Sequence, residues 1–451
     1  MFTSTDTIAA LATPVGTSAI AVVRASGPQV AALLAGIFQE AAPPRQVRHA
    51  DYRDLGGKVI DDALFVFFAG PNSFTGEDTM EVFCHGSPFI AQMILADLFA
   101  RGCRPAEAGE FTRRAFLNGR MDLSQAEAVM DVIHAQSERA LAVANQQLRG
   151  SLKRKMDNLI ALLINVLANI EAYIDFPEED LPEENRQALI DKLQTIQAET
   201  GRLIATRHYG DLLRGGLKTV ILGEPNAGKS SLLNRLVGHE RALVSPDPGT
   251  TRDYLEERLV VGAHSLRLVD TAGLNPAAVS LEMRGIEKTL EQAATADLFL
   301  WVVDSTQGLP ALPPRIAGLL TPANTMVVFN KNDLPDAMPR GPLPSGFSSI
   351  SISALHGQGL DGLLNCIARL ADAFQVSVGD EIVAINARHA RALEMARAAL
   401  EAGMLKLRRV DHKELLASDL REAMAAFGEI AGRVDHERVL DAIFAGFCIG
   451  K

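Results

Sequence analysis

The chain has 451 residues, 47% of them hydrophobic and 22% charged, which is enough for about three globular domains. Its formal net charge of −11 argues against a protein that coats nucleic acid without specificity, although it allows a local basic patch or a basic partner. The four cysteines form no CxxC or Cys/His cluster, which disfavours a zinc site or a disulfide framework. The start has no secretory pattern, and the longest apolar run, 159–170, is shorter than the roughly 20 residues of a membrane span. We therefore expect a cytoplasmic protein without a membrane partner.

The first part of the chain predicts a mixed α/β domain. Strands are expected at 18–23 and 63–68, with turn residues at 56–57 (GG) and 70–73 (GPNS). A helix is expected at 89–101, because this stretch begins after Pro88 and ends before Gly102. We place the end of this domain at residue 120.

The pattern becomes helical from residue 121. Asp122 and Gln125 predict a capping box, and helical periodicity then continues with few breaks to about residue 174. A second helix is expected from Pro182 to about residue 208, since proline followed by two glutamates suits a helix start.

Strands and helices alternate after the glycine pair at 215–216, as in a parallel sheet with crossover helices. After Asn386 the chain is helical again almost to its end. The sequence therefore predicts an α/β domain at 1–120, a helical domain in two parts at 121–214 and 376–451, and a second α/β domain inserted at 215–375.

Residues 223–230 read GEPNAGKS and fit the P-loop pattern G-x-x-x-x-G-K-[ST]. The motif follows an expected strand at 219–222 and precedes an expected helix at 231–237, which is the context that it requires. Its glycines let backbone N–H groups surround phosphates, Lys229 neutralises their charge, and the Ser230 hydroxyl can ligate Mg²⁺. A glycine turn with a surface lysine would not need this context.

Three more motifs follow in the order found in GTPases. Residues 270–273 read DTAG after an expected strand, which brings a carboxylate near Mg²⁺ and a glycine N–H near the γ-phosphate. Residues 330–333 read NKND, and Asp333 can accept two hydrogen bonds that guanine offers and adenine does not. Residues 353–355 read SAL and fit the loop that closes over guanine O6. The predicted substrate is GTP.

The hydrolytic residues are less standard. Ras-like enzymes orient the attacking water with a glutamine just after the DxxG motif, whereas this chain has Leu274 there. Thr250 and Thr251 could reach Mg²⁺. Arg252 could act as an arginine finger in cis, but a solvated or ion-paired loop arginine is the simpler interpretation. Another group must orient the water, or hydrolysis will be slow.

These motifs resemble the MnmE (TrmE) family of tRNA-modification GTPases along essentially the whole chain. The segments that carry the likeness are DTIAA at 6–10, VVRASG at 22–27, PNSFTGED at 71–78, GEFT at 109–112, PNAGKSSLLN at 225–234, GTTRD at 249–253 and FCIGK at 447–451. The resemblance implies an N-terminal α/β folate-binding domain that dimerises, a discontinuous helical domain and an inserted Ras-like P-loop GTPase domain.

The motifs and the resemblance together imply a GTP site formed by the P-loop, the loop at 245–251 and the DTAG, NKND and SAL motifs. They are Asn226, Ala227, Gly228, Lys229, Ser230, Ser231, Ser245, Asp247, Gly249, Thr250, Thr251, Asp270, Thr271, Ala272, Gly273, Asn330, Lys331, Asp333, Ser353, Ala354 and Leu355. Ser230 and Thr251 are the expected Mg²⁺ ligands.

The resemblance also implies a replacement for the missing glutamine. Asn226 matches the family's K⁺-ligating asparagine, and the expected K⁺ ligands around it are Ser245, Asp247 and Thr250. Glu282 matches the family's catalytic glutamate, which positions the water, although by itself it would be read as an exposed helix carboxylate.

In the N-terminal domain the resemblance implies a site for 5-formyltetrahydrofolate. Arg24, Glu81, Arg120 and Lys451 fall at matching positions, although the family usually has lysine in place of Arg120. Without the family, each would be read as a solvated charge or an ion pair. Cys448 matches a functionally required, catalytic thiol; a buried inert cysteine is the alternative, and prenylation fits its tail poorly.

The resemblance implies a K⁺-dependent GTPase that acts with the FAD-dependent protein MnmG at C5 of the wobble uridine (U34) of tRNA. The added aminomethyl or carboxymethylaminomethyl group would take its one-carbon unit from tetrahydrofolate. The expected assembly is a homodimer through the N-terminal domain, and a heterotetramer with MnmG.

Two alternatives belong to other functional classes. One is a regulatory switch in ribosome assembly such as Era or EngA, in which Arg24, Glu81 and the Cys448 tail would have no purpose. The other is a membrane-remodelling GTPase, which the lack of an anchor or a basic amphipathic surface disfavours.

Overall fold

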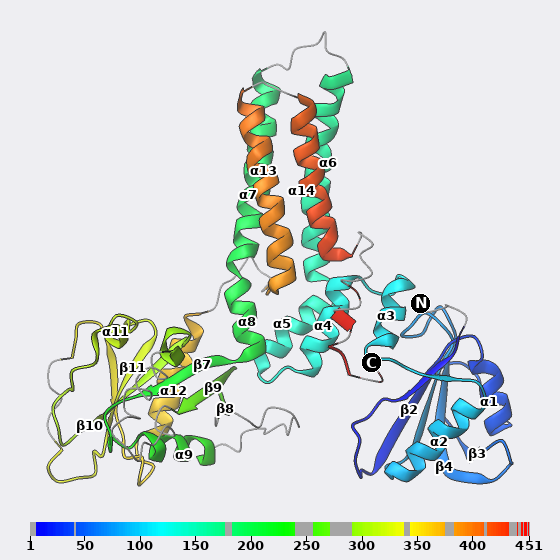
Figure 1. Cartoon of the computed structure of the whole chain (residues 1–451), viewed down its shortest axis with the longest axis horizontal. Coiled ribbons are helices and arrows are strands. Elements are labelled where there is room, and N and C mark those ends of the chain that lie inside the picture. The colour runs from blue at the N-terminus through cyan, green and yellow to red at the C-terminus, as the bar shows by residue number, and fades with distance from the viewer. Residues whose placement is uncertain are drawn as a thin grey trace. The chain divides into compact units, whose positions relative to one another are not determined.

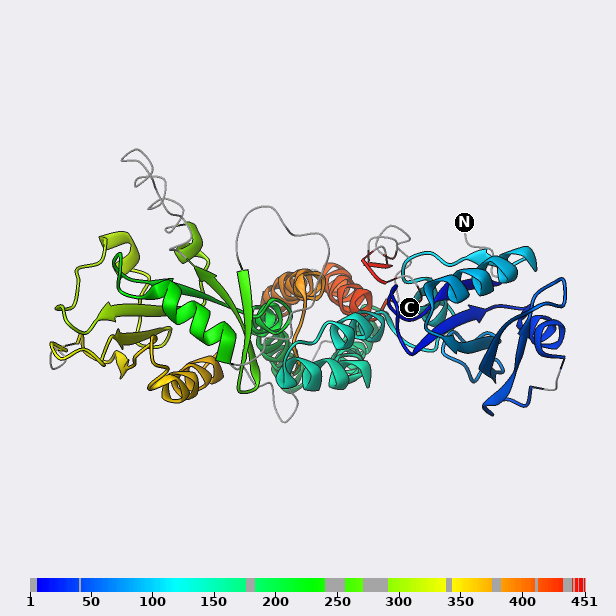
Figure 2. The same ribbon diagram turned by 90° about the horizontal axis from the view of Figure 1, so that it is seen from below.

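The computed structural model divides the chain into two compact units, shown from two sides in Figures 1 and 2. The described residues are 6–39, 42–175, 183–239, 256–270, 291–337, 343–374, 383–409, 413–432, 440, 443–444, 446–448 and 450. Unit 1 contains Met1–Met130, Leu152–Asn158 and Phe427–Lys451, and unit 2 contains Asp131–Ser151 and Leu159–Ala426.

Unit 1 is built on a six-stranded sheet in the order β3-β4-β5-β2-β1-β6. The strands are β1 (Ile8–Leu11), β2 (Ile20–Ser26), β3 (Arg48–Arg53), β4 (Val59–Phe68), β5 (Thr79–His85) and β6 (Arg104–Pro105). Neighbouring strands are antiparallel, except that β1 and β6 are parallel. This mixed α/β domain agrees with the fold predicted for the N-terminal segment.

Two helices cover one face of this sheet. α1 (Val30–Phe38) and α2 (Pro88–Ala100) pack their apolar residues against side chains such as Val23, Phe65 and Val82. Because successive side chains of a strand point to opposite faces, Arg24 and Glu81 lie on the other face. The sheet therefore has one face that builds the core and one that α1 and α2 leave uncovered.

The helix predicted after residue 121 begins with the expected cap. The Asp122 N–H donates to Gln125 Oε1, the Gln125 N–H donates to Asp122 Oδ1, and both distances are 3.0 Å. This confirms the capping box at the start of α4 (Leu123–Ile133), which follows α3 (Glu110–Leu117).

Among the described residues, six helices that lie wholly or mainly in unit 2 come from the two sides of the inserted α/β segment. α5 (Glu138–Leu148), α6 (Ser151–Asp175), α7 (Glu183–Ala205) and α8 (Arg207–Gly215) precede it, and α13 (Ala387–Arg409) and α14 (Lys413–Ala431) follow it. The long helices α6, α7, α13 and α14 run side by side, and Figure 2 shows them end-on. The predicted discontinuous helical architecture is confirmed.

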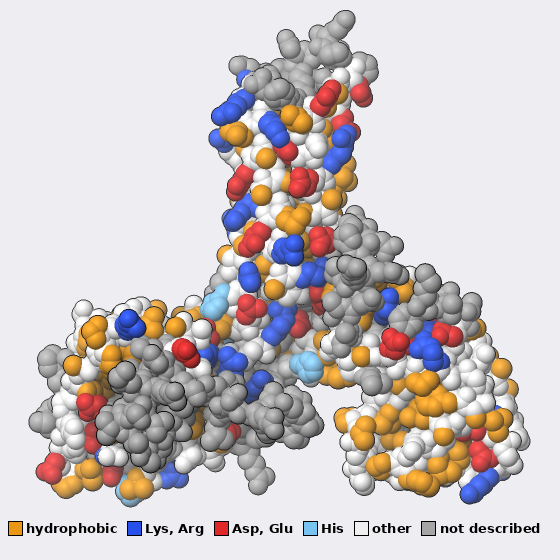
Figure 3. Space-filling view, viewed as in Figure 1, with side chains coloured by type: hydrophobic (Ala, Val, Ile, Leu, Met, Phe, Trp, Pro, Cys, Tyr) orange, Lys and Arg blue, Asp and Glu red, His pale blue; other side chains and the backbone are white. Residues whose placement is uncertain are grey.

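Polar contacts join these long helices. Arg421 of α14 forms an ion pair with Glu171 of α6 at 2.5 Å, and Lys192 of α7 donates to Asn165 Oδ1 of α6 at 2.6 Å. On the face shown in Figure 3, basic and acidic side chains alternate along the bundle, so no large basic surface is seen there. None of the described helices combines the length and apolar character of a membrane span.

The inserted segment forms the second six-stranded sheet, in the order β12-β11-β10-β7-β9-β8. The strands are β7 (Leu217–Leu222), β8 (Glu256–Val261), β9 (His264–Asp270), β10 (Leu298–Asp304), β11 (Thr325–Asn330) and β12 (Ser348–Ser351). All neighbours are parallel except β8 and β9.

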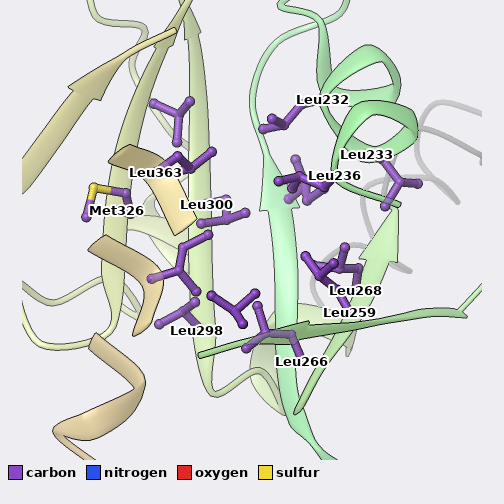
Figure 4. Packing of buried hydrophobic residues seen from close by; sticks show 14 of the residues in the cluster. Leu232, Leu233, Leu236, Leu259, Leu266, Leu268, Leu298, Leu300, Met326 and Leu363 are labelled. Carbon is purple, nitrogen blue, oxygen red and sulfur yellow. The ribbon is translucent and has the colours of Figure 1, made fainter. Parts of the chain in front are cut away.

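Buried leucines hold helices against this sheet. Leu232 and Leu236 of α9 (Lys229–His239) and Leu363 of α12 (Leu360–Asp372) belong to one apolar cluster with side chains of β9, β10 and β11 (Figure 4). A short helix, α11 (Pro314–Ala317), precedes β11. Because β7, β10 and β11 are parallel, their carboxyl ends meet at one edge of the sheet, which is where doubly wound folds bind ligands.

Candidate functional site

The P-loop lies at that edge, between β7 and α9. Gly223, Asn226 and Gly228 have positive φ angles of 147°, 65° and 93°. A Cβ added at Gly223 would lie 2.2 Å from the Val302 carbonyl oxygen, so glycine lets the loop pass directly over β10. Lys229 Nζ lies over the loop and donates to the carbonyls of Gly223 at 3.0 Å and Glu224 at 2.8 Å.

Asn330 connects the P-loop to the SAL segment. Its Nδ2 donates to the Ala227 carbonyl at 2.9 Å, and its Oδ1 accepts from the Ala354 N–H at 2.9 Å. The side chain is buried, and Gly228 packs directly against it. Asn330, which is 103 residues from Ala227 and 24 from Ala354, thus joins three motifs into one hydrogen-bonded unit.

Lys331 is held by a residue that the sequence analysis did not single out. Its Nζ donates to Asp304 Oδ2 at 2.6 Å, and Asp304 Oδ1 accepts from the Thr306 hydroxyl at 2.7 Å. Partial burial alone would raise the pKa of Asp304, but the hydrogen bonds from Lys331 and Thr306 outweigh it and keep this pKa below its usual value. Asp304 could have been recognised in the sequence as a carboxylate at the carboxyl end of a buried strand.

The groups around Asp333 stabilise the ionised form of its carboxylate. A hydrogen bond from the Ser353 hydroxyl lowers its pKa, and His356, with Nε2 at 3.6 Å from Asp333 Oδ2, lies beside it. The carboxylate is therefore ionised at neutral pH. Ser353 and Asp333, predicted from separate motifs, lie together.

Arg235 of α9 is a second residue that the motifs did not reveal. Its guanidinium donates to the carbonyl of Ala354 at 3.2 Å and also to the carbonyl of Leu355. It fixes the SAL segment from the helix that follows the P-loop. Leu355 itself is 72% exposed, and it takes part in this contact through its backbone carbonyl and not through its side chain.

Ser230 and Ser231 begin α9 with exposed side chains, and Asn226 is exposed on the loop before them. Ser230, the expected Mg²⁺ ligand, and Asn226, the expected K⁺ ligand, are thus accessible from solvent. The other predicted residues of the site lie outside the described residues, namely Ser245, Asp247, Gly249, Thr250, Thr251, Arg252, Thr271, Ala272, Gly273, Leu274 and Glu282. Asp270 is described only as the last residue of β9.

The second candidate site is in unit 1. Arg24 of β2 and Glu81 of β5 are opposite each other in the antiparallel register, and Arg24 Nη2 and Nε donate to Glu81 Oε1 at 2.6 and 2.9 Å. The guanidinium also lies 5.6 Å from the ring centres of Phe74 and Phe111. Arg24 Nη1 donates to the Gly450 carbonyl at 3.3 Å, so the C-terminal tail reaches this pair.

The other predicted residues of this site are less closely joined. Arg120 is exposed, and its side chain lies beside Gly76 of the PNSFTGED loop. Cys448 is exposed, and its carbonyl accepts from the Gly109 N–H at 3.4 Å, so the buried-cysteine alternative is wrong. Lys451 lies outside the described residues.

Comparisons with known proteins agree over the full length of the chain. The family model "MnmE helical domain" matches residues 123–448, and "GTP-binding protein TrmE N-terminus" matches residues 7–120. A protein named tRNA modification GTPase MnmE from Opitutus terrae is 58% identical over 447 residues, which cover 99% of both chains. One of the same name from Akkermansia muciniphila is 43% identical over 458 residues, again with 99% of both chains covered. This chain belongs to the MnmE family of tRNA modification GTPases.

One cluster of this MnmE-family chain was missed because its members are far apart in the sequence. Arg114 of α3 donates to Asp6 Oδ1 at 2.7 Å and Glu110 Oε1 at 2.9 Å, and forms an ion pair with Glu77 at 3.2 Å. Burial alone would lower the pKa of Arg114, but these carboxylates raise it above its usual value. The guanidinium thus ties the N-terminal segment and the PNSFTGED loop to α3.

Proposed function

We propose that this chain binds and hydrolyses GTP as the nucleotide-driven part of a tRNA-modifying enzyme. The observation that carries the GTP site is the Asn330 side chain, which joins the P-loop to the SAL segment. The ionised carboxylate of Asp333 suits the N1–H and 2-amino donors of guanine. Adenine would leave this acid unpaired, which is how a polar site rejects an analogue.

The residues at the phosphate end fit a magnesium nucleotide. Ser230 offers an exposed hydroxyl at the start of α9, where the positive end of the helix dipole also favours phosphate. In the proposed site Ser230 and Thr251 ligate Mg²⁺, and Lys229 neutralises phosphate charge. The test is hydrolysis of GTP beside ATP: Lys229→Ala should abolish turnover, and hydrolysis of ATP at the rate of GTP would refute the guanine site.

We further propose that K⁺ completes the phosphate site and that Glu282 positions the attacking water. Support comes from Leu274, which cannot orient water, and from Asn226, whose amide is exposed on the P-loop. An amide oxygen with the loop oxygens of Ser245, Asp247 and Thr250 is apt for a large, weakly hydrated cation. Glu282→Ala should lower kcat while GTP affinity remains; lost affinity would reassign Glu282 to binding.

For the unit 1 site we propose a tetrahydrofolate, with 5-formyltetrahydrofolate as the expected form. Both hydrogen bonds from Arg24 go to Glu81 Oε1, so Oε2 has no hydrogen-bond partner among the described residues and can accept from pterin N–H groups. Phe74 offers a partly exposed aromatic ring beside them. Arg120 and Lys451 would bind the glutamyl carboxylates of the folate.

The uncovered face of the unit 1 sheet supports the proposed homodimer. Ile20 and Leu64 lie on the same face as Arg24 and Glu81, and they are 58% and 41% exposed. Apolar side chains exposed on a sheet face favour burial against a partner. A second copy of this domain would cover them and place the folate residues at or beside the dimer interface.

The tRNA chemistry is proposed from the names of the relatives and from the C-terminal tail. We propose that the chain acts in the cytoplasm with the flavoprotein MnmG, as a heterotetramer, at C5 of the wobble uridine of tRNA. Folate would supply the one-carbon unit, and Cys448, which is exposed near Arg24's partner Gly450, would take part in that chemistry.

Wobble-nucleoside mass spectrometry of tRNA from cells that lack the protein tests this proposal. The aminomethyl-type modification should be missing, and a chain without residues 448–451 should not restore it although its GTPase activity persists. Unchanged nucleosides would favour the ribosome-assembly switch instead. The relatives that match along the whole chain bear the tRNA modification name, which favours the first outcome.

A further inference from the structure

Unit 2 contains a cavity of about 290 Å³ that lies away from the P-loop. It is formed where the end of α4 and the loop 134–136 meet α5, α8 and strand β8. This volume is close to the lower end of the roughly 300–1,000 Å³ typical of small-molecule pockets. At about 30 Å³ for a water in the liquid, it corresponds to roughly ten non-hydrogen atoms. None of its lining residues is expected to bind GTP or folate.

The walls of the cavity are divided between apolar and polar residues. α5 contributes Ala140, Val143 and Ala144, and α8 contributes Leu213. The polar groups that face them are Asp131, His134, Gln136, Gln147, Arg214 and Arg258. An apolar wall with a few convergent polar groups is the usual composition of a ligand site.

The charges of the lining residues do not cancel. Arg214 Nε and Nη2 donate to the two oxygens of Asp131 at 2.8 and 2.9 Å, so this carboxylate is already engaged in a bidentate pair. Arg258 of β8 donates instead to the neutral amide oxygen of Gln136. Two arginines against one aspartate leave an excess of one positive charge, with histidine counted as neutral.

Gln147 adds an unsatisfied amide to the same cavity. Its side chain is 2% exposed, and its Nε2 has no hydrogen-bond partner among the described residues. Buried amide groups are rarely left without a partner in native proteins. Rotation about χ3 exchanges the amide oxygen and nitrogen, so this donor can be turned toward an acceptor held in the cavity.

We propose that this cavity binds a small oxyanion, namely a carboxylate or phosphoryl group on a molecule of roughly ten non-hydrogen atoms or fewer. The guanidinium of Arg258 neutralises the anion, the Gln147 amide donates to one of its oxygens, and the α5 wall contacts its apolar part. Arg258 belongs to the sheet that carries the P-loop and Gln147 to helix α5, so the bound molecule would join these two elements.

Isothermal titration of the full chain with inorganic phosphate and, separately, with acetate tests the proposal. The chain is loaded with GDP first, because the P-loop would otherwise bind phosphate. We expect saturable binding of at least one of the two anions. Tighter binding of phosphate would identify a phosphoryl ligand, and tighter binding of acetate a carboxylate ligand.

Gln147→Glu and Arg258→Gln locate the site. Gln147→Glu replaces the amide donor by a negatively charged carboxylate on a side chain of the same size. Arg258→Gln removes the positive charge of an exposed residue. Each should weaken binding about tenfold or more, whereas Arg202→Gln on the exposed surface of α7 should leave it unchanged. Thermal unfolding shows which variants remain folded, and Arg258→Gln decides the matter if Gln147→Glu does not fold. The absence of binding by both anions, or binding of wild-type strength in a folded variant at either position, would overturn the proposal.

Discussion

A Cβ added at Gly228 would lie 2.1 Å from the amide nitrogen of Asn330. That nitrogen donates to Ala227, and the oxygen of the same amide accepts from Ala354. The glycine of the GKS sequence is therefore required by its contact with the NKND segment as well as by the phosphates that the loop is expected to hold. The P-loop, which is expected to bind phosphate, and the NKND segment, which is expected to bind the base, therefore share one packing contact.

Gly228→Ala should consequently disturb base and phosphate binding together. The new methyl group would displace Asn330 from a buried position and break its hydrogen bonds, which should cost about 1–3 kcal/mol of the free energy of unfolding. We expect GTP affinity to fall about tenfold or more, measured by calorimetric titration. Gly238→Ala in α9 is the matched control, since a Cβ there meets no atom within 4 Å and alanine favours helix. A Gly228→Ala chain that binds GTP as the wild type does would contradict the role assigned to this contact.

Each motif could be predicted because its residues are consecutive in the sequence. The residues elsewhere in the chain that contact these motifs could not be predicted. Arg235, Asp304 and Arg114 are ordinary charged residues in the sequence, and only tertiary packing brings them to Leu355, Lys331 and Asp6. Nothing in the residues near each one indicates its partner. The division into domains at residues 120, 214 and 375 stays a prediction.

The ends of helices and strands are hard to predict for the same reason, because they also depend on residues far away in the sequence. The strand predicted at 18–23 extends in the structure from Ile20 to Ser26, so Arg24 lies within β2 and not after it. Its charge would be unfavourable in a buried strand, but Glu81, 57 residues away, lies opposite in the register. The strand was predicted to end before Arg24 because the sequence does not show that Glu81 lies opposite this charged residue.

The helical stretch predicted after Asp122, with few breaks, is divided in the structure into α4, α5 and α6. Ser137 caps α5 by accepting from the Ala140 N–H at 3.2 Å, and Gly150 has a φ of 81° before α6 begins. The loop that Ser137 ends lines the cavity of unit 2. The first of these two breaks therefore lies at the candidate binding site.

Asp333→Asn should change the base that the chain accepts. The amide would offer a donor where guanine also presents donors, so GTP affinity should fall about a hundredfold or more. Xanthosine triphosphate, with an oxygen in place of the 2-amino group, should bind the variant better than GTP does. Competition titrations with both nucleotides measure this exchange, and a variant that still prefers GTP would remove Asp333 from the base site.

The lowered pKa of Asp333 gives this interaction a pH dependence. The carboxylate is the form that accepts from guanine, so the contribution is present above its pKa and lost as the pH falls through it. Since this pKa lies below the ordinary aspartate value of about 3.9, GTP affinity should not decline for this reason between pH 8 and pH 5. A carboxyl-dependent loss of affinity near pH 6 would contradict the hydrogen bond from Ser353.

Arg24 should be required for folate binding in a way that lysine cannot replace. Arg24 contacts Glu81 through two nitrogens and reaches Gly450 with a third, a geometry that a single ammonium group does not reproduce. We expect Arg24→Lys to weaken 5-formyltetrahydrofolate about tenfold or more in a fluorescence or calorimetric titration. Arg53→Ala, which removes a partly exposed ion pair with Asp51, is the control for general loss of charge. Equal folate affinity in Arg24→Lys and the wild type would move the folate site elsewhere.

Asn226→Gly should separate cation dependence from nucleotide binding. Asn226 has a φ of 65°, which glycine adopts without strain, so the substitution removes the amide and leaves the loop conformation accessible. If the amide oxygen is a K⁺ ligand, the variant should bind GTP within about twofold of the wild type but lose the stimulation of turnover by K⁺ over Na⁺. Steady-state phosphate release in the two salts at equal ionic strength measures this difference. K⁺ stimulation that survives in Asn226→Gly would exclude Asn226 as the ligand, and equal wild-type rates in both salts would exclude the cation from the reaction.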